Sequence, residues 1–121
     1  MRLSALALLP LLAAASDRVP EATPAGPPVS CLRLADIRES LVRDDRTIDF
    51  VTRSRRQVYR VTLPYACPNL GFERRFSYAT SLDRLCSTDI ITVLSETGGG
   101  LSPAGSCGMG QFQPVTLAAA H

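Results

Sequence analysis

The chain has 121 residues, and about 105 remain if its N-terminal export segment is removed, which is enough for one small domain but not for a cofactor domain plus a substrate domain. All 13 basic residues are arginine, lysine and tryptophan are absent, and the only histidine is the last residue, His121. Ser-His-Asp, Cys-His, Ser-Lys and Schiff-base mechanisms therefore lose their central residue, and a Walker A loop loses its lysine. We expect a protein that is not an enzyme and that binds no cofactor.

Residues 1–16 have the order of a secretory signal peptide: one charge at Arg2, an apolar run, and small residues at the end. The apolar run contains Pro10 and is shorter than the roughly 20 residues of a membrane-spanning helix. We expect cleavage after Ala15 or Ser16, with a retained signal anchor as the alternative. The mature chain would then lack a transmembrane segment and be periplasmic or secreted. Its 12 arginines against 11 acidic residues leave a charge near +1, which does not favour nucleic acid as a partner.

Composition divides the mature chain into three parts. Residues 17–30 contain four prolines among small residues and cannot bury enough apolar surface to offset the entropy of ordering, so they are predicted to be a disordered lead. Residues 31–115 are predicted to form a single β domain. Residues 116–121 are small and without pattern, and they are predicted to be a disordered tail.

Strand patterns dominate the first half of this domain. Residues 47–52 and 57–63 alternate polar and apolar side chains with a period of 2, and the polar segment 53–56 between them is short enough to close a hairpin. Residues 37–42 are predicted to pair with the first of these strands through a short turn. Residues 32–36 are predicted to form a helical turn.

The second half contains more loops. Residues 64–71 hold two prolines and a glycine and predict a loop or an irregular helical turn. Residues 76–80 and 89–94 predict strands, and the second should be central because it is apolar on both faces. Residues 97–105, with four glycines and a proline, predict a mobile loop, and 109–115 predict a closing strand. Five or six short strands with one helical turn indicate a mainly β fold, either a small antiparallel barrel or a curled sheet.

Four cysteines in an exported chain of this size predict two disulfides. A four-cysteine zinc site normally uses close C-x-x-C pairs, and the sequence contains none, so we expect no metal. Three connectivities are open. An up-and-down strand order would place Cys31 and Cys86 at one end of the sheet, and Cys67 and Cys107 at the other. This order favours the pairs Cys31–Cys86 and Cys67–Cys107.

Acidic side chains are the only remaining candidates for catalysis, as the acid and base of a glycosidase. The candidates are Asp44, Asp45, Asp49 and Glu73. A domain this small offers little room for a cleft, and the first two are typical turn residues, whereas Asp49 should point outward from its strand. Asp89 opens an apolar strand and is expected to accept hydrogen bonds from the backbone or to pair with Arg84.

Arginines are the candidates for an anion-binding surface, because guanidinium groups bind phosphate and carboxylate groups well. The candidates are Arg53, Arg55, Arg56, Arg60, Arg74 and Arg75. The alternative, favoured by the small net charge, is a solvated hairpin tip.

Two short segments, Cys-Pro-x-Leu at residues 67–70 and Arg-Leu-Cys-x-x-Asp at 84–89, occur in this order. Together with the patterns around residues 45–50, 58–64 and 106–112, they resemble a family of small exported bacterial proteins catalogued only as a domain of unknown function. The likeness spans most of residues 31–115. It implies an exported, cysteine-containing single domain, and it supplies no activity and no site residues.

The sequence therefore predicts an exported, disulfide-stapled module that binds a component of the envelope or another protein. The alternative is an inhibitor of a secreted hydrolase, such as a protease or a lysozyme, since a rigid stapled scaffold suits an exposed inhibitory loop. Residues 97–106 would form that loop. A small carboxylate-dependent hydrolase is the third hypothesis.

Overall fold

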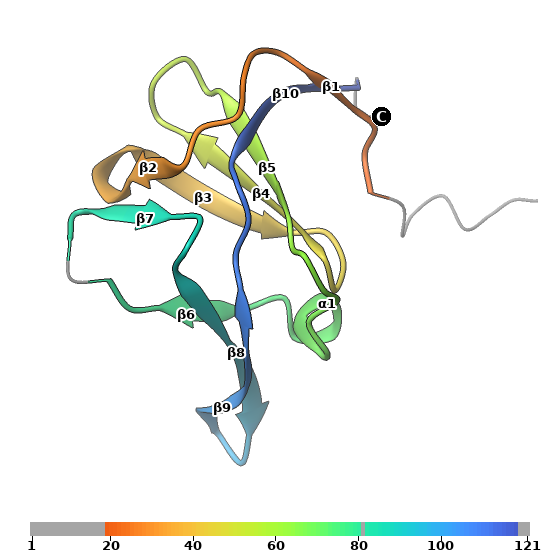
Figure 1. Ribbon diagram of the computed structural model, residues 1–121. Helices are drawn as coiled ribbons and strands as arrows, with labels where there is room; N and C mark the ends of the chain where they lie inside the picture. The colour runs from red at the N-terminus through yellow and green to blue at the C-terminus, as the bar shows by residue number, and fades with distance from the viewer. Residues whose placement is uncertain (1–18, 81, 119–121) are drawn as a thin grey trace, which may run out of the picture.

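Residues 19–80 and 82–118 are described by the computed structural model (Figure 1). The predicted export signal lies outside these residues, as do the start of the predicted lead and the last three residues of the predicted tail. Two short helical elements interrupt the strands: η2 (Leu34–Asp36) and α1 (Leu70–Glu73). The strands are β1 (Ala22–Pro24), β2 (Cys31–Arg33), β3 (Ile37–Val42), β4 (Thr47–Thr52), β5 (Val58–Thr62), β6 (Phe76–Tyr78), β7 (Arg84–Cys86), β8 (Ile90–Thr97), β9 (Gly100–Gly108) and β10 (Gln113–Leu117).

The strands form three antiparallel sheets, with the orders β1-β10-β5-β4-β3, β2-β7 and β6-β8-β9. The prediction of a mainly β protein with antiparallel strands and a short helical turn is confirmed. In place of one barrel or one curled sheet, the described residues form separate sheets. The chain leaves the five-stranded sheet after β5, and strands β6, β8 and β9 then pair with one another rather than with β3 (Figure 1).

The meander of β3, β4 and β5 agrees with the sequence pattern. Ile48 lies opposite Val61, and Phe50 lies opposite Tyr59, so the apolar side chains of neighbouring strands share one face. The tip between β4 and β5 is a two-residue turn in which Arg55 and Arg56 both have positive φ, 58° and 51°. Such a turn matches the right-handed twist of the flanking strands, although Asn-Gly is its usual sequence. The predicted helical turn is shorter than expected, because its first two residues belong to β2.

The prediction of a disordered lead at residues 17–30 is wrong for the residues that the structure describes. From residue 19 on it is described, and β1 within it pairs with β10. The amide of Ala25 donates to the carbonyl of Pro114 at 2.9 Å, and Val29 forms a bridge with Phe112. These contacts are made by the backbone, so a composition poor in large apolar side chains does not reveal them. The predicted tail likewise begins inside β10, and Ala118 donates to the carbonyl of Glu21.

The predicted mobile loop at residues 97–105 is wrong. Strands β8 and β9 form a hairpin through this region, with Thr97 opposite Gly100. Gly98 and Gly99 alone form the turn, with φ of 60° and 87°, and Gly105 accommodates a further positive φ within β9. The glycines therefore mark one tight turn and one irregular strand position rather than a long loop. The closing strand is also shifted, because residues 109–112 form a loop before β10.

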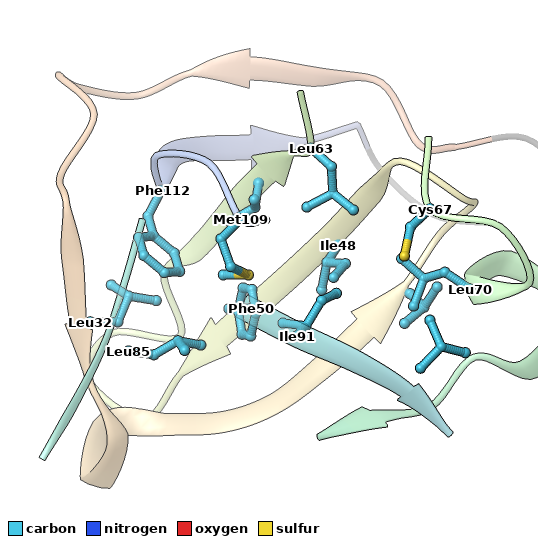
Figure 2. Packing of buried hydrophobic residues seen from close by; sticks show 13 residues of the cluster. Leu32, Ile48, Phe50, Leu63, Cys67, Leu70, Leu85, Ile91, Met109 and Phe112 are labelled. Atoms are coloured by element: carbon cyan, nitrogen blue, oxygen red, sulfur yellow. The ribbon is translucent and has the colours of Figure 1, made fainter. Parts of the chain in front are cut away.

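The core lies between the five-stranded sheet and the two smaller sheets. Figure 2 shows Ile48 and Phe50 of β4 facing Ile91 of β8, with Phe112 beside them. The Phe50 ring makes edge-to-face contacts with Phe112 and Phe76, at centroid distances of 5.6 and 6.3 Å. The loop at residues 109–112 thus contributes core side chains, and within it Phe112 also forms the bridge to Val29.

Two disulfides brace this arrangement. Cys31 is joined to Cys86 across the β2–β7 pair, and Cys67, in the loop after β5, is joined to Cys107 of β9. These are the predicted pairs, and the second ties the five-stranded sheet to the β8–β9 hairpin. Two disulfides are consistent with an oxidising compartment outside the cytoplasm.

Candidate functional site

Asp49 lies in the middle of β4 on the face opposite the core. Its neighbours Ile48 and Phe50 point into the core, so the strand geometry directs Asp49 outward as predicted. Its side chain is nevertheless fully buried. Arg60 Nε and Nη2 donate to its two oxygens at 2.8 and 2.9 Å, and Arg43 Nε donates to Oδ2 at 2.8 Å. Two arginines therefore cover the carboxylate that the sequence predicted to point outward.

The charge on Asp49 is fixed by these neighbours. Burial raises the pKa of the Asp49 carboxyl, but the hydrogen bonds and positive charges of Arg60 and Arg43 outweigh burial and lower the pKa below its ordinary value. The group is ionised at neutral pH and both oxygens are occupied. Its hydrogen bonds link β4 to β5 and to Arg43 after β3, and the ionised group has no proton to donate at neutral pH.

The other candidate carboxylates are also held by local contacts. Asp44 Oδ1 accepts the amide of Arg46 at 2.9 Å, as expected for a turn residue. Glu73 Oε2 accepts the hydroxyl of Ser95 at 3.0 Å.

Asp89 accepts the amide of Cys86 at 2.7 Å, which confirms the expectation of a backbone partner. Arg84 instead lies 3.9 Å from Asp83, with both side chains largely exposed.

The six arginines predicted as one anion-binding surface are not brought together. Arg53, Arg55 and Arg56 lie at the β4–β5 tip. Arg74 lies at the other end of β4, where its Nη1 donates to the carbonyl of Val42, just before the β3–β4 turn. The six-residue strand β4, about 17 Å long, separates the two ends.

The remaining two predicted arginines are paired with acids. Arg60 is occupied by Asp49, and Arg75 Nη1 lies 3.3 Å from Glu96 Oε1 on the surface. A different group of arginines, Arg43, Arg46 and Arg74, comes together at the start of β4.

This cluster surrounds an open hollow of about 410 Å³ between the β3–β4 turn and α1. The hollow is lined by Arg43, Asp44, Asp45, Arg46, Gly71 and Arg74. Only Arg74 was a predicted anion ligand. The turn sequence Arg-Asp-Asp-Arg at residues 43–46 is the signal that could have identified the other two arginines.

Backbone contacts hold the turn against the segment that follows β5. Cys67 donates to the carbonyl of Asp45 at 2.7 Å, and Leu63 donates to that of Arg46 at 2.8 Å. Asp45 Oδ1 accepts the amide of Gly71 at 2.7 Å, which fixes the start of α1 beside the turn. A Cβ at Gly71 would lie 2.9 Å from this oxygen, so glycine permits the close approach.

A second feature is the β8–β9 hairpin, whose turn projects away from the five-stranded sheet (Figure 1). In the described part of the chain, β9 is paired with β8 alone, and its nine residues include no charged side chain. Leu101, next to the turn, is 58% exposed. The hairpin therefore presents an open strand edge.

A third feature is a smaller hollow of about 310 Å³ beside the disulfide at Cys107, lined in part by the exposed Tyr65.

Residues 19–80 and 82–118 contain no cluster of three or more His, Cys, Asp or Glu side chains suited to a metal ion. No helix formed by these residues is long and apolar enough to cross a membrane.

Comparison with known proteins adds no identity: the chain matches no protein-family model, no curated protein and no solved structure.

Proposed function

We propose that the protein is an exported, non-enzymatic binding module that recognises another protein of the cell envelope through the β8–β9 hairpin. The observation that supports this most is the open edge of β9. Natural sheets usually protect an edge strand with charged side chains, bulges or covering segments, because unpaired backbone groups recruit other strands. Strand β9 has no charged side chain to deter a partner. Among the described residues, Pro103 and a bulge protect it, and the segment linked through Cys67 lies beside its Cys107 end.

The recognition mode follows from this edge. An extended segment of a partner can add to β9 by backbone hydrogen bonds, and side chains near the turn then supply specificity. Leu101 is the exposed apolar side chain beside the turn. The disulfide at Cys107 anchors the far end of β9, so the strand loses little freedom on binding.

The location and the absence of catalysis belong to the same proposal. The signal-like residues 1–16 and the two disulfides support export to an oxidising compartment. Of the candidate carboxylates, Asp49 has both oxygens occupied by arginines, and Asp44, Asp45 and Glu73 each have one oxygen in a structural hydrogen bond.

A photo-crosslinking residue at position 101 in the native host tests the proposal. We expect it to capture a defined protein that the same residue at position 55, on the opposite hairpin tip, does not capture. Leu101→Asp in the chain carrying the crosslinker at Ser102 should abolish the adduct. Identical adducts from positions 101 and 55, or an adduct that survives Leu101→Asp, would overturn the proposal.

The second candidate is an inhibitor of a secreted protease or lysozyme, and the two-residue turn at Gly98 and Gly99 favours it. A tight turn held by paired strands offers an inhibitory segment that is already ordered before binding. Inhibition by the mature protein at micromolar concentration, lost in Leu101→Asp, would support this function. Failure against a panel of both enzyme classes would count against it.

A further inference from the structure

We infer that the hollow between the β3–β4 turn and α1 binds the oxyanion group of a small molecule, a phosphate or a carboxylate, through Arg43, Arg46 and Arg74. This site is separate from the β8–β9 hairpin. The three guanidinium groups come from two segments of the chain, the turn at residues 43–46 and the end of α1.

Each arginine is held in place by one side of its guanidinium group. Arg43 Nε donates to the buried Asp49, and Arg74 Nη1 donates to the carbonyl of Val42 at 3.1 Å. Arg46 Nε and Nη2 donate to the carbonyls of Leu63 and Pro64, at 2.7 and 3.2 Å. The side chains are therefore ordered before a ligand arrives, which lowers the entropic cost of binding.

The other side of each group remains available to a ligand. Among the described residues, no hydrogen-bond acceptor contacts Nη1 or Nη2 of Arg43, Nη1 of Arg46, or Nε and Nη2 of Arg74. Planar guanidinium groups with paired free donors suit carboxylate and phosphate oxygens, which accept two parallel hydrogen bonds.

The charge of the lining favours an anion, although two aspartates reduce the effect. Asp44 and Asp45 each have one oxygen bound to a backbone amide, of Arg46 and Gly71 respectively. Three arginines against two aspartates leave one net positive charge in the lining. The volume, about 410 Å³, lies in the lower part of the range for small-molecule sites, about 300 to 1,000 Å³.

The backbone at Arg74 fixes where this side chain starts. Its φ of 60° is in the left-handed region, which side chains other than glycine and asparagine rarely adopt. The residue ends α1, and the conformation directs the chain into β6. Glycine would meet this requirement with less strain, and the hydrogen bond from Arg74 Nη1 to the carbonyl of Val42 offsets part of the cost.

The test is an amide chemical-shift titration of the mature protein at low salt, with inorganic phosphate in one series and acetate in another. We expect shifts at residues 43–46 and 70–75, and the two series distinguish phosphate from carboxylate recognition. Arg74→Gln should weaken binding about tenfold, since it removes a charge-assisted contact. Arg55→Gln removes the same charge from the opposite end of β4 and should leave the affinity within about twofold.

A further variant keeps the test decisive if Arg74→Gln perturbs the fold. Asp44→Asn retains a side-chain oxygen for the turn and removes one repelling charge, so binding should tighten about threefold. Shifts centred on residues 53–56, equal effects of Arg74→Gln and Arg55→Gln, or no shifts with either anion would overturn the inference.

Discussion

Asp49 and Arg60 lie directly opposite each other in the β4–β5 pair, and the guanidinium group of Arg60 contacts both oxygens of the buried carboxylate. The pair lies on the face of the sheet that is turned away from the hydrophobic core. Arg43 completes the group from the end of β3. Side chains on the outer face of the five-stranded sheet are thus linked by an ion cluster, whereas those on the inner face are packed in the hydrophobic core.

Asp49→Asn should lower the free energy of unfolding by about 3 kcal/mol, because Arg60 and Arg43 would lose their shared counter-charge while remaining largely covered. Urea denaturation of the mature protein measures this change. Asp83→Asn is the matched control, since Asp83 is 84% exposed and its contact with Arg84 is long. A similar small loss in both variants would show that the buried cluster does not stabilise the fold.

The same cluster predicts a pH dependence. The pKa of Asp49 is lower in the folded protein than its ordinary value of about 3.9, so the ionised carboxylate favours folding. Its contribution is complete above the unfolded pKa and is lost as the pH falls through the lower folded pKa. The stability difference between the native protein and Asp49→Asn should be constant near neutrality and shrink below about pH 4. A difference that grows on acidification would contradict the assignment of charge.

The disulfides should carry a large share of the stability. The bridges close loops with separations of 55 and 40 residues, for which the chain-entropy relation gives about 4 kcal/mol each. Removal of Cys67 and Cys107 together, as a double serine variant, should therefore lower the melting temperature strongly, and reductant should do the same to the native protein. An unchanged melting temperature in reductant would refute the role of the bridges.

Periodic strands and covalent bridges were the predictable part of the fold. The alternation at residues 47–52 identified β4. The pairing of Cys31 with Cys86 was also predicted correctly, although the up-and-down order of one sheet on which it was based is replaced by three separate sheets. Short strands such as β1 escaped prediction because backbone groups rather than side chains hold them in place. Strand β9 escaped because glycine and proline normally indicate loops, whereas here they lie in a strand with a free edge.

The candidate site was predictable only in part. Arg74 was identified from its neighbourhood in the sequence, but a cluster that depends on the meeting of a turn and a helix is set by tertiary structure. The burial of Asp49 was missed for the same reason, since its two arginines are 6 and 11 residues away along the chain. Strand periodicity gives the direction of a side chain, and its neighbours decide whether water reaches it.

The β4–β5 tip predicts a stabilising change. Arg55 and Arg56 both adopt positive φ, where residues other than glycine and asparagine are strained by about 1 kcal/mol or more each. Replacement of the pair by Asn-Gly should therefore raise the free energy of unfolding by about 1 to 2 kcal/mol. Thermal and urea denaturation would measure the gain. Equal or lower stability would show that the arginine side chains make compensating contacts at the tip.

Replacement by alanine should change the free energy of unfolding differently at Gly108 and Gly110, near the end of β9. A Cβ at Gly110 would lie 2.7 Å from the carbonyl oxygen of Thr62, a backbone atom that can move only with β5. Gly110→Ala should therefore cost about 1 to 3 kcal/mol, as overpacking does in a core, because the loop at 109–112 also holds buried Phe112 in place.

Gly108 provides the control, because a Cβ there meets no atom within 4 Å and its φ is not positive. Gly108→Ala should be neutral or slightly stabilising, since alanine restricts the unfolded chain more than glycine does. Urea denaturation of both variants under one set of conditions compares them directly. Equal stabilities would mean that the loop does not approach β5 as closely as the structure shows, and the packing of Phe112 beneath that loop would then need a different explanation.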